Sequence, residues 1–194
     1  IDPVDPTQTY LHYRVNYGST ASLRMYDDGA HGDGAAGDGV YGATIPAGVS
    51  DPGEMVRWYV TAEDTTGRQM RAPILVPINP VNNEGGPEYF GTVVADPSVT
   101  SDMPILEWFC PSPSAANTRG GTRSSLFYDG EFYDNVFTRV RGGSTAGSPN
   151  PSHKFDMNKG YHFRYMTDES PAEEFNVNTM VSDKSYLRQI LSYD

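Results

Sequence analysis

"EMVRWYVTAED" (54–64) is the stretch that indicates a β fold for the first half of the chain. Its apolar side chains recur at every second position, which is the pattern of a half-buried strand. One face would carry Val56, Trp58, Val60 and Ala62, and the other Arg57, Tyr59, Thr61 and Glu63. Further segments with strand character, separated by turn residues, span 9–16, 20–26, 40–46 and 68–75. Short strands at this spacing predict an all-β sandwich over residues 1–79.

The second half of the chain has the pattern of a separate, β-rich α+β region. A proline-rich sequence without periodicity precedes it, and we place a linker at 80–87. Within 88–194 lies "RSSLFYDGEFYDNVFTRVRGG" (123–143), where Asp129-Gly130 is typical of a two-residue type I′ hairpin turn. The other expected elements are strands at 103–110 and 175–180, a second hairpin at 152–165 and a helix at 183–194 capped by Ser182.

The composition restricts the classes of partner and the compartment. The 194 residues carry a formal net charge of −11, which argues against binding to nucleic acid or to anionic membranes. No apolar run approaches the ~20 residues of a membrane-spanning helix. The single cysteine, Cys110, allows no disulfide within the chain and is compatible with a secreted protein. Because the chain starts at Ile1 and stops inside the expected final helix, we expect a fragment of a larger protein.

An acidic, glycine-rich loop interrupts the strands of the first half. "YDDGAHGDGAAGDGVYG" (26–42) contains Asp27, Asp28, Asp33 and Asp38 with glycines between them. Calcium takes six to eight oxygen ligands, and glycine lets the backbone turn its carbonyls inward. We therefore expect Ca²⁺ in the loop over 27–38. The alternative is a hairpin loop whose aspartates accept hydrogen bonds from nearby backbone amides as Asx-turns.

Several motifs of the second half carry a resemblance to a known family. "GTRSSLFYDGEFYDNVFTRVRGGS", "SHKFDMNKGYHFRY" and "SDKSYLRQILSYD" together resemble the N-terminal part of the CotH kinase-like family, over 88–194. The first half, with "MYDDGAHGDGAAGDGVYGATIP" before "VRWYVTAEDTTG", resembles the immunoglobulin-like or fibronectin-III-like module often placed before CotH domains in large secreted bacterial proteins. The resemblance implies the N-terminal lobe of an atypical protein kinase, which phosphorylates Ser or Thr of secreted or coat proteins with ATP and a divalent metal.

The resemblance also implies which residues bind the nucleotide. The family pattern corresponds here to Arg141, Ser144 and Lys154, with Lys154 facing the phosphates. From the residues alone, Lys154 can equally be a solvated strand lysine and Arg141 part of an ion pair at a hairpin end. The family's metal-binding and catalytic acids lie downstream of the final helix, and neither Asp134 nor Asp156 takes their place. The chain itself is therefore expected to be non-catalytic, with ATP and metal bound only by the full-length protein.

Two other functional readings remain open at this point. One is a structural or adhesive protein of the cell surface, in which the CotH-like region is a non-catalytic scaffold. The other is a carbohydrate-binding module that uses Tyr26, Tyr41 and Tyr59 as sugar platforms. Under the kinase reading, the apolar stripe of the final helix is covered by the downstream remainder of the chain or by self-association, and the substrate is an extracellular protein.

Overall fold

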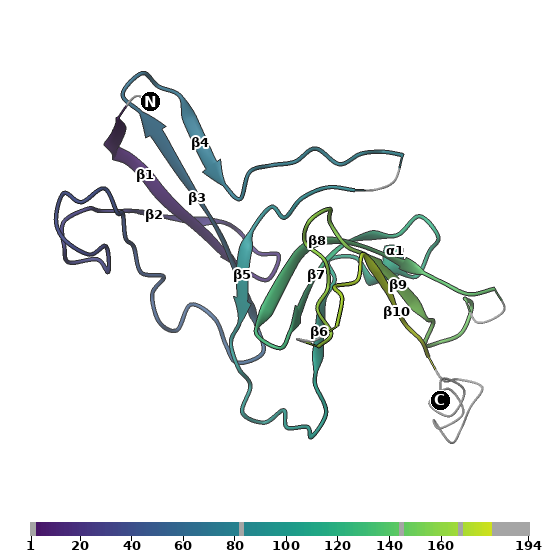
Figure 1. Ribbon diagram of the computed structural model, residues 1–194. Coiled ribbons are helices and arrows are strands. Elements are labelled where there is room, and N and C mark those ends of the chain that lie inside the picture. Colours follow the sequence, from purple (N-terminus) through teal and green to yellow (C-terminus); the bar gives the residue numbers. More distant parts are fainter. Residues whose placement is uncertain (1–2, 82–83, 144–145, 167–168, 180–194) are drawn as a thin grey trace. The chain divides into compact units, whose positions relative to one another are not determined.

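The computed structural model describes residues 3–81, 84–143, 146–166 and 169–179, and its regular structure is almost entirely β (Figure 1). The strands of the first half are β1 (Val4–Val15), β2 (Ala21–Arg24), β3 (Met55–Asp64), β4 (Gln69–Ala72) and β5 (Phe90–Val93). Then follow β6 (Leu106–Phe109), the short helix α1 (Pro113–Ala116), β7 (Thr122–Tyr128), β8 (Glu131–Val140), β9 (His153–Asp156) and β10 (Glu174–Val177). In the part of the chain that the structure describes, no helix is both long enough and apolar enough to cross a bilayer.

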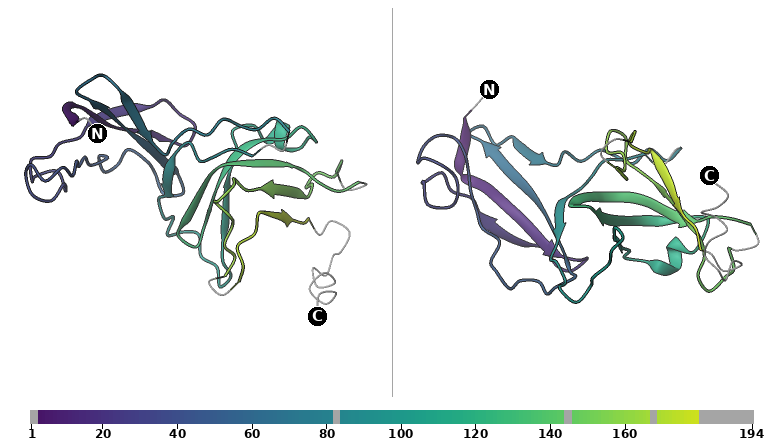
Figure 2. Two further views of the ribbon diagram at one scale, coloured as in Figure 1. Left: turned by 45° about the horizontal axis from the view of Figure 1, so that its top comes forward. Right: turned by 60° about the horizontal axis from the view of Figure 1, so that its bottom comes forward.

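Strand β3 is the centre of the first sheet, which has the order β2-β1-β3-β4 with β5 also paired to β3 (Figure 2). On one side β3 pairs antiparallel with β1. On its other side, β5 pairs with Met55–Trp58 at the start of the strand and β4 with Val60–Glu63 at its end. Strand β5 follows the linker expected at 80–87, so hydrogen bonding of the first sheet extends past the sandwich expected over 1–79.

The strand expected over 40–46 is not formed, and that prediction was wrong. Only an isolated bridge between Tyr26 and Gly42 lies there. Gly39, just before this segment, has φ of 86°, outside the strand region, and the Val40 side chain is 54% exposed. Without a neighbouring strand or a buried face, alternation alone does not hold this segment extended.

The second sheet has the order β10-β9-β8-β7-β6. The predicted type I′ turn between β7 and β8 is confirmed, because Asp129 and Gly130 both have positive φ, 48° and 81°. The hairpin expected over 152–165 is replaced by a small turn with an Asn158–Tyr161 bridge, and β9 pairs instead with β10. The helix expected at 183–194 lies outside the described residues, so the α part of the expected kinase-like lobe is not shown.

The chain divides into two compact units, each with its own core. One consists of Ile1–Ile78, Gly85–Phe109 and Ser125–Asn135, and the other of Asn79–Glu84, Cys110–Ser124 and Val136–Asp194. Buried apolar side chains of the first unit are Leu11, Met55, Val56, Leu126, Tyr128 and Tyr133. In the second unit the ring of Phe175 on β10 stacks between Phe155 and Phe163, at centroid distances of 5.0 and 4.2 Å.

Candidate functional site

Lys154, the residue that the resemblance assigns to phosphate binding, lies on β9 among charged side chains of the second unit. Its Nζ is 2.9 Å from Asp156 Oδ1 and also pairs with Glu174 Oε2 on β10. Arg139 on β8 stands directly opposite Lys154 in the strand register, and its Nε is 3.9 Å from Asp156 Oδ2. Alternation places Lys154 and Asp156 on one sheet face and the buried Phe155 on the other.

These side chains border a polar hollow of about 430 Å³. Its charged lining residues are Glu84, Arg139, Lys154, Asp156, Lys159, Glu173 and Glu174, and His162 lies beside them. The hydrogen bond from Lys154 lowers the pKa of the Glu174 carboxyl, and the same bond raises the pKa of Lys154. Both groups are therefore charged at neutral pH, and Lys154 is a cation held in place by two carboxylates.

Arg141 and Ser144 do not extend this arrangement in the described structure. Arg141 donates from Nη1 to the side-chain oxygen of Asn178 at 2.9 Å, and it is not among the residues that border the hollow. Ser144 lies outside the described residues. Of the three residues proposed for the nucleotide, the hollow therefore contains Lys154 alone among those described.

Asp33 organises the acidic loop through its carboxylate, which is completely buried. The backbone amides of Asp28 and Gly29 donate to Oδ2 at 2.5 and 2.7 Å, and that of His31 donates to Oδ1 at 2.8 Å. These bonds, with that of Gly29 the strongest, lower the pKa of Asp33. The loop closes where the backbones of Gly42 and Tyr26 are hydrogen-bonded to each other. Glycine is required at position 42 because a Cβ there would stand 2.3 Å from the carbonyl oxygen of His31.

The other three aspartates of the loop also bind backbone amides. Asp27 accepts from the amides of residues 37, 38 and 39, and Asp38 accepts from those of residues 35 and 40. Asp28 accepts from the amide of residue 30 and contacts the His31 ring nitrogen at 2.9 Å. Among residues 3–81, 84–143, 146–166 and 169–179, no three His, Cys, Asp or Glu side chains gather closely enough to hold a metal ion. The calcium site over 27–38 stays a prediction, and the Asx-turn alternative describes the hydrogen bonds that the loop makes.

Two of the three tyrosines considered as sugar platforms, Tyr26 and Tyr59, have neighbours on their ring faces. Tyr26 stacks on His31 at a centroid distance of 4.6 Å. Tyr59 stacks on His12 at 4.5 Å, and the guanidinium of Arg71 lies 4.1 Å from the Tyr59 centroid. Rings covered in this way offer less free surface to a sugar than an open platform does.

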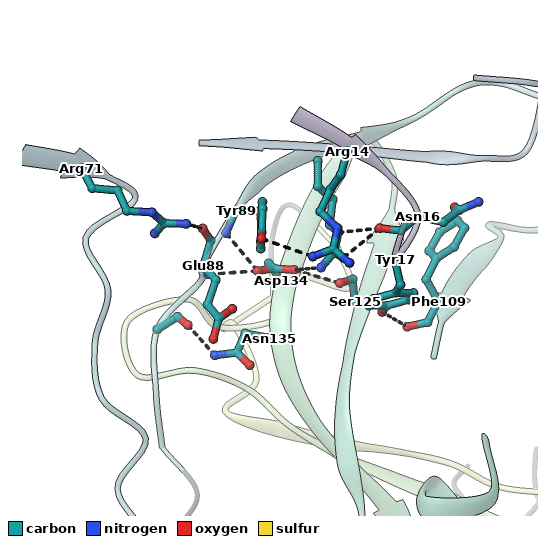
Figure 3. A network of polar contacts seen from close by, with 12 residues as sticks. Arg14, Asn16, Tyr17, Arg71, Glu88, Tyr89, Phe109, Ser125, Asp134 and Asn135 are labelled. Carbon is teal, nitrogen blue, oxygen red and sulfur yellow. Dashed lines mark hydrogen bonds and ion pairs between the residues drawn. The ribbon is translucent and has the colours of Figure 1, made fainter. Parts of the chain in front are cut away.

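A buried ion pair in the first unit was not foreseen from the sequence (Figure 3). The side chains of Arg57 on β3 and Asp134 on β8 are 6% and 2% exposed, and Nη1 is 3.3 Å from Oδ1. The guanidinium also donates to the backbone oxygen of Asn16, at 3.2 Å from Nε and 2.8 Å from Nη2. Its carbon lies 4.4 Å from the ring centroid of Tyr17 and 4.7 Å from that of Tyr89. The charge of a guanidinium group is delocalised and the group is weakly hydrated, so it can be buried between aromatic rings more easily than an ammonium group.

Asp134 uses both carboxylate oxygens (Figure 3). Oδ1 accepts from Arg57 and from the Ser125 hydroxyl at 2.9 Å, and Oδ2 accepts from the backbone amides of Glu88 and Tyr89 at 2.9 and 3.0 Å. The pair thus joins β3, β7, β8 and the segment before β5 within the first unit. Its donors and acceptors are used internally, which makes it a structural network. The available signal was an arginine in the middle of an apolar strand, at position 57.

Comparison with known protein families gave a match to one part of the chain. Residues 6–70 match the family described as the second Ig-like domain of conditioned medium factor. This stretch contains most of β1, all of β2 and β3, the acidic loop and the start of β4. No curated protein and no solved structure matches the chain. The predicted Ig-like module is supported for this stretch, and the CotH kinase-like resemblance of the second half stays a prediction.

Proposed function

We propose that this chain combines an Ig-like module with the N-terminal portion of a CotH-type, kinase-like domain of a secreted or cell-surface bacterial protein. The complete protein would transfer the γ-phosphoryl group of ATP to Ser or Thr of an extracellular protein, and the 194-residue chain alone would not. The observation that carries the proposal is the position of Lys154, a strand lysine held by Asp156 and Glu174 at the border of a polar hollow.

A lysine paired with a carboxylate is one recurring component of phosphoryl-transfer sites, where it contacts the nucleotide phosphates. The hollow of about 430 Å³ falls within the ~300–1,000 Å³ typical of small-molecule sites. Four carboxylates, including Asp156 and Glu174, line it beside three lysine or arginine side chains, so a free polyphosphate would meet repulsion as well as attraction. A divalent metal that bridges carboxylate and phosphate oxygens would remove this repulsion. The proposal therefore requires nucleotide binding to depend on the metal.

The test is nucleotide binding by the full-length protein, measured with a fluorescent ATP analogue in Mg²⁺ and in EDTA. Lys154→Met should weaken binding at least tenfold, whereas Lys159→Met, which removes an exposed lysine of the same hollow, should change it less than about threefold. Equal affinity of wild type and Lys154→Met would refute the role of Lys154. Phosphoryl transfer by the 194-residue chain alone would show that the catalytic residues were misplaced.

A second candidate function is a structural or adhesive surface protein with a non-catalytic scaffold. It is favoured by the contacts of the two proposed phosphate-binding cations, since Lys154 pairs with two carboxylates and Arg141 with Asn178. Under this reading the ion pairs of Lys154 have only a structural role, which is to hold β9 against β10. Absence of nucleotide binding by the folded full-length protein, at millimolar nucleotide with Mg²⁺ or Mn²⁺, would favour the scaffold.

A further inference from the structure

A groove of about 350 Å³ lies in the first unit between the loop after β5 and the neighbouring strands β6 and β7. Its apolar lining residues are Val93, Ala95, Val99, Ile105 and Phe127. The groove is separate from the Lys154 hollow and from the acidic loop, with which it shares no lining residue.

Apolar side chains at and near this groove are open to solvent. The exposed fractions are 55% for Val99, 40% for Ile105 and 75% for the nearby Met103. Strand β6 is the edge strand of the second sheet as the described residues form it, so no further strand lies on its outer side. Contiguous exposed apolar surface next to a sheet edge is typical of a site where another polypeptide binds.

The groove also carries a carboxylate without a partner. Glu107 on β6 stands opposite Phe127 on β7 in the register, and both side chains line the groove. Within the described part of the chain, the Glu107 carboxylate has no hydrogen bond and no ion pair. Burial raises the pKa of Glu107, because the charged form is partly removed from water. A cation placed beside this carboxylate would offset the cost of its desolvation.

The remaining charges of the groove have the same sign. Asp96 and Asp129 line it together with Glu107, and no Lys, Arg or His is among the described lining residues. Asp96 accepts from the amide and hydroxyl of Ser98 at 2.9 and 2.7 Å, and these bonds lower its pKa. The groove therefore combines apolar side chains with three carboxylates.

We propose that this groove binds an extended segment of a partner protein that carries a Lys or Arg beside a branched or aromatic apolar side chain. The apolar side chain contacts Val99, Ile105 and Phe127, and the cation pairs with Glu107. Charge selects this occupant over a second copy of the chain, which has a net charge of −11 and would bring more negative charge to an acidic groove.

A random dodecapeptide display library, selected on the immobilised intact chain in low salt, tests the proposal. Enriched peptides should contain Lys or Arg next to Val, Ile, Leu or Phe. Their affinity, measured by fluorescence anisotropy, should fall at least fivefold with Glu107→Gln and with Ile105→Ser. It should stay within twofold with Glu169→Gln, a matched control in which the same charge is removed from an exposed site of the second unit.

Each contrary outcome overturns the proposal. Failure of the library to yield any enriched peptide would do so, as would enrichment of acidic peptides. Peptides that bind Glu107→Gln as tightly as wild type would exclude the proposed ion pair. A dimer in sedimentation analysis that Ile105→Ser dissociates would show that a second copy occupies the groove instead. Folding of both variants is checked by urea unfolding, and the partly exposed Glu107 and Ile105 make large losses of stability unexpected.

Discussion

The substitution Asp134→Asn should destabilise the chain strongly although it changes almost no volume. Asp134 Oδ1 accepts from Arg57 and Ser125, and Oδ2 accepts from the amides of Glu88 and Tyr89. Asparagine retains a single acceptor oxygen and directs an NH₂ group at one of these pairs of donors. If its oxygen keeps the two amides, the NH₂ group faces the guanidinium, which stays buried without its anion.

The expected magnitude follows from this loss of the anion. Removing one partner of a buried ion pair costs about 3–5 kcal/mol, because an uncompensated charge is left inside. Arg57 keeps its bonds to Asn16 and its contacts with two tyrosine rings, which places the loss at the lower end of the range. Against a domain stability of ~5–15 kcal/mol, such a loss shifts the urea midpoint by a large fraction.

Urea unfolding, followed by tryptophan fluorescence, measures the effect, since both tryptophans, Trp58 and Trp108, belong to the first unit. The matched control is Asp129→Asn in the same β7–β8 hairpin. Asp129 is exposed and has φ of 48°, a conformation that asparagine also tolerates, so the change should be within about 0.5 kcal/mol. If Asp134→Asn costs less than about 1 kcal/mol, or no more than Asp129→Asn, the reasoning about the buried pair is wrong.

A double-mutant cycle separates the ion pair from the other bonds of Asp134. Arg57→Met alone leaves Asp134 with Ser125 and two amides, and the double variant removes both charges. The two changes should be less than additive, with a coupling of roughly 0.5–3 kcal/mol. Strict additivity would mean that Arg57 and Asp134 act independently, contrary to their 3.3 Å separation.

Three further predictions concern other sites. Gly91→Ala should lower the free energy of unfolding in urea by roughly 1–3 kcal/mol, because a Cβ there would stand 2.3 Å from the Phe132 ring. Adding Phe132→Leu should recover part of this loss, and a Gly91→Ala variant as stable as wild type would contradict the packing. Glu174→Gln should cost no more than about 1 kcal/mol near pH 7, since Glu174 is largely exposed. The hydrogen bond from Lys154 lowers the pKa of the Glu174 carboxyl and raises the pKa of Lys154, so the cost should fade as pH falls through the lowered carboxyl pKa and as pH rises through the raised Lys154 pKa. If the acidic loop binds Ca²⁺, the ion should raise the melting temperature of wild type but not of Asp33→Ala, and calorimetry without heat or a melting shift in wild type would remove the calcium prediction.

The parts of the fold that depend on residues close together in the chain could be predicted from the sequence. Period-two alternation predicted strands at the positions of β1, β2, β3 and β4, and the Ig-like match over 6–70 covers the same stretch. The Asp129-Gly130 turn was predictable because a type I′ turn needs positive φ at both residues, which few residue types tolerate. These features depend on neighbours in the chain, so a short window of sequence contains the information.

The candidate sites were only partly predictable for the same reason. The resemblance to the CotH kinase-like family indicated Lys154 as a site residue. The ion-pair partner of Lys154, Glu174, is twenty positions away, and the β9–β10 register places the two residues side by side. The acidic loop was visible in composition, whereas the burial of Asp33 among backbone amides depends on how the loop folds back on itself. Glu107 gave no signal, because an unpaired carboxylate becomes distinctive only when apolar neighbours surround it.

The sequence by itself determined the approximate positions of most strands, the tight turn between β7 and β8, and the concentration of charge and glycine in the loop. Tertiary structure decided the rest. Residues 40–46 alternate but do not join a sheet, whereas β5 pairs with β3, from Trp58 opposite Phe90 to Met55 opposite Val93. Arg57 and Asp134 are 77 positions apart, and although an arginine between apolar residues was a signal at position 57, nothing in the sequence indicated Asp134 as its partner. The physical reason is that burial and pairing of a charge depend on which distant segments pack against it, and only the folded chain brings those segments together.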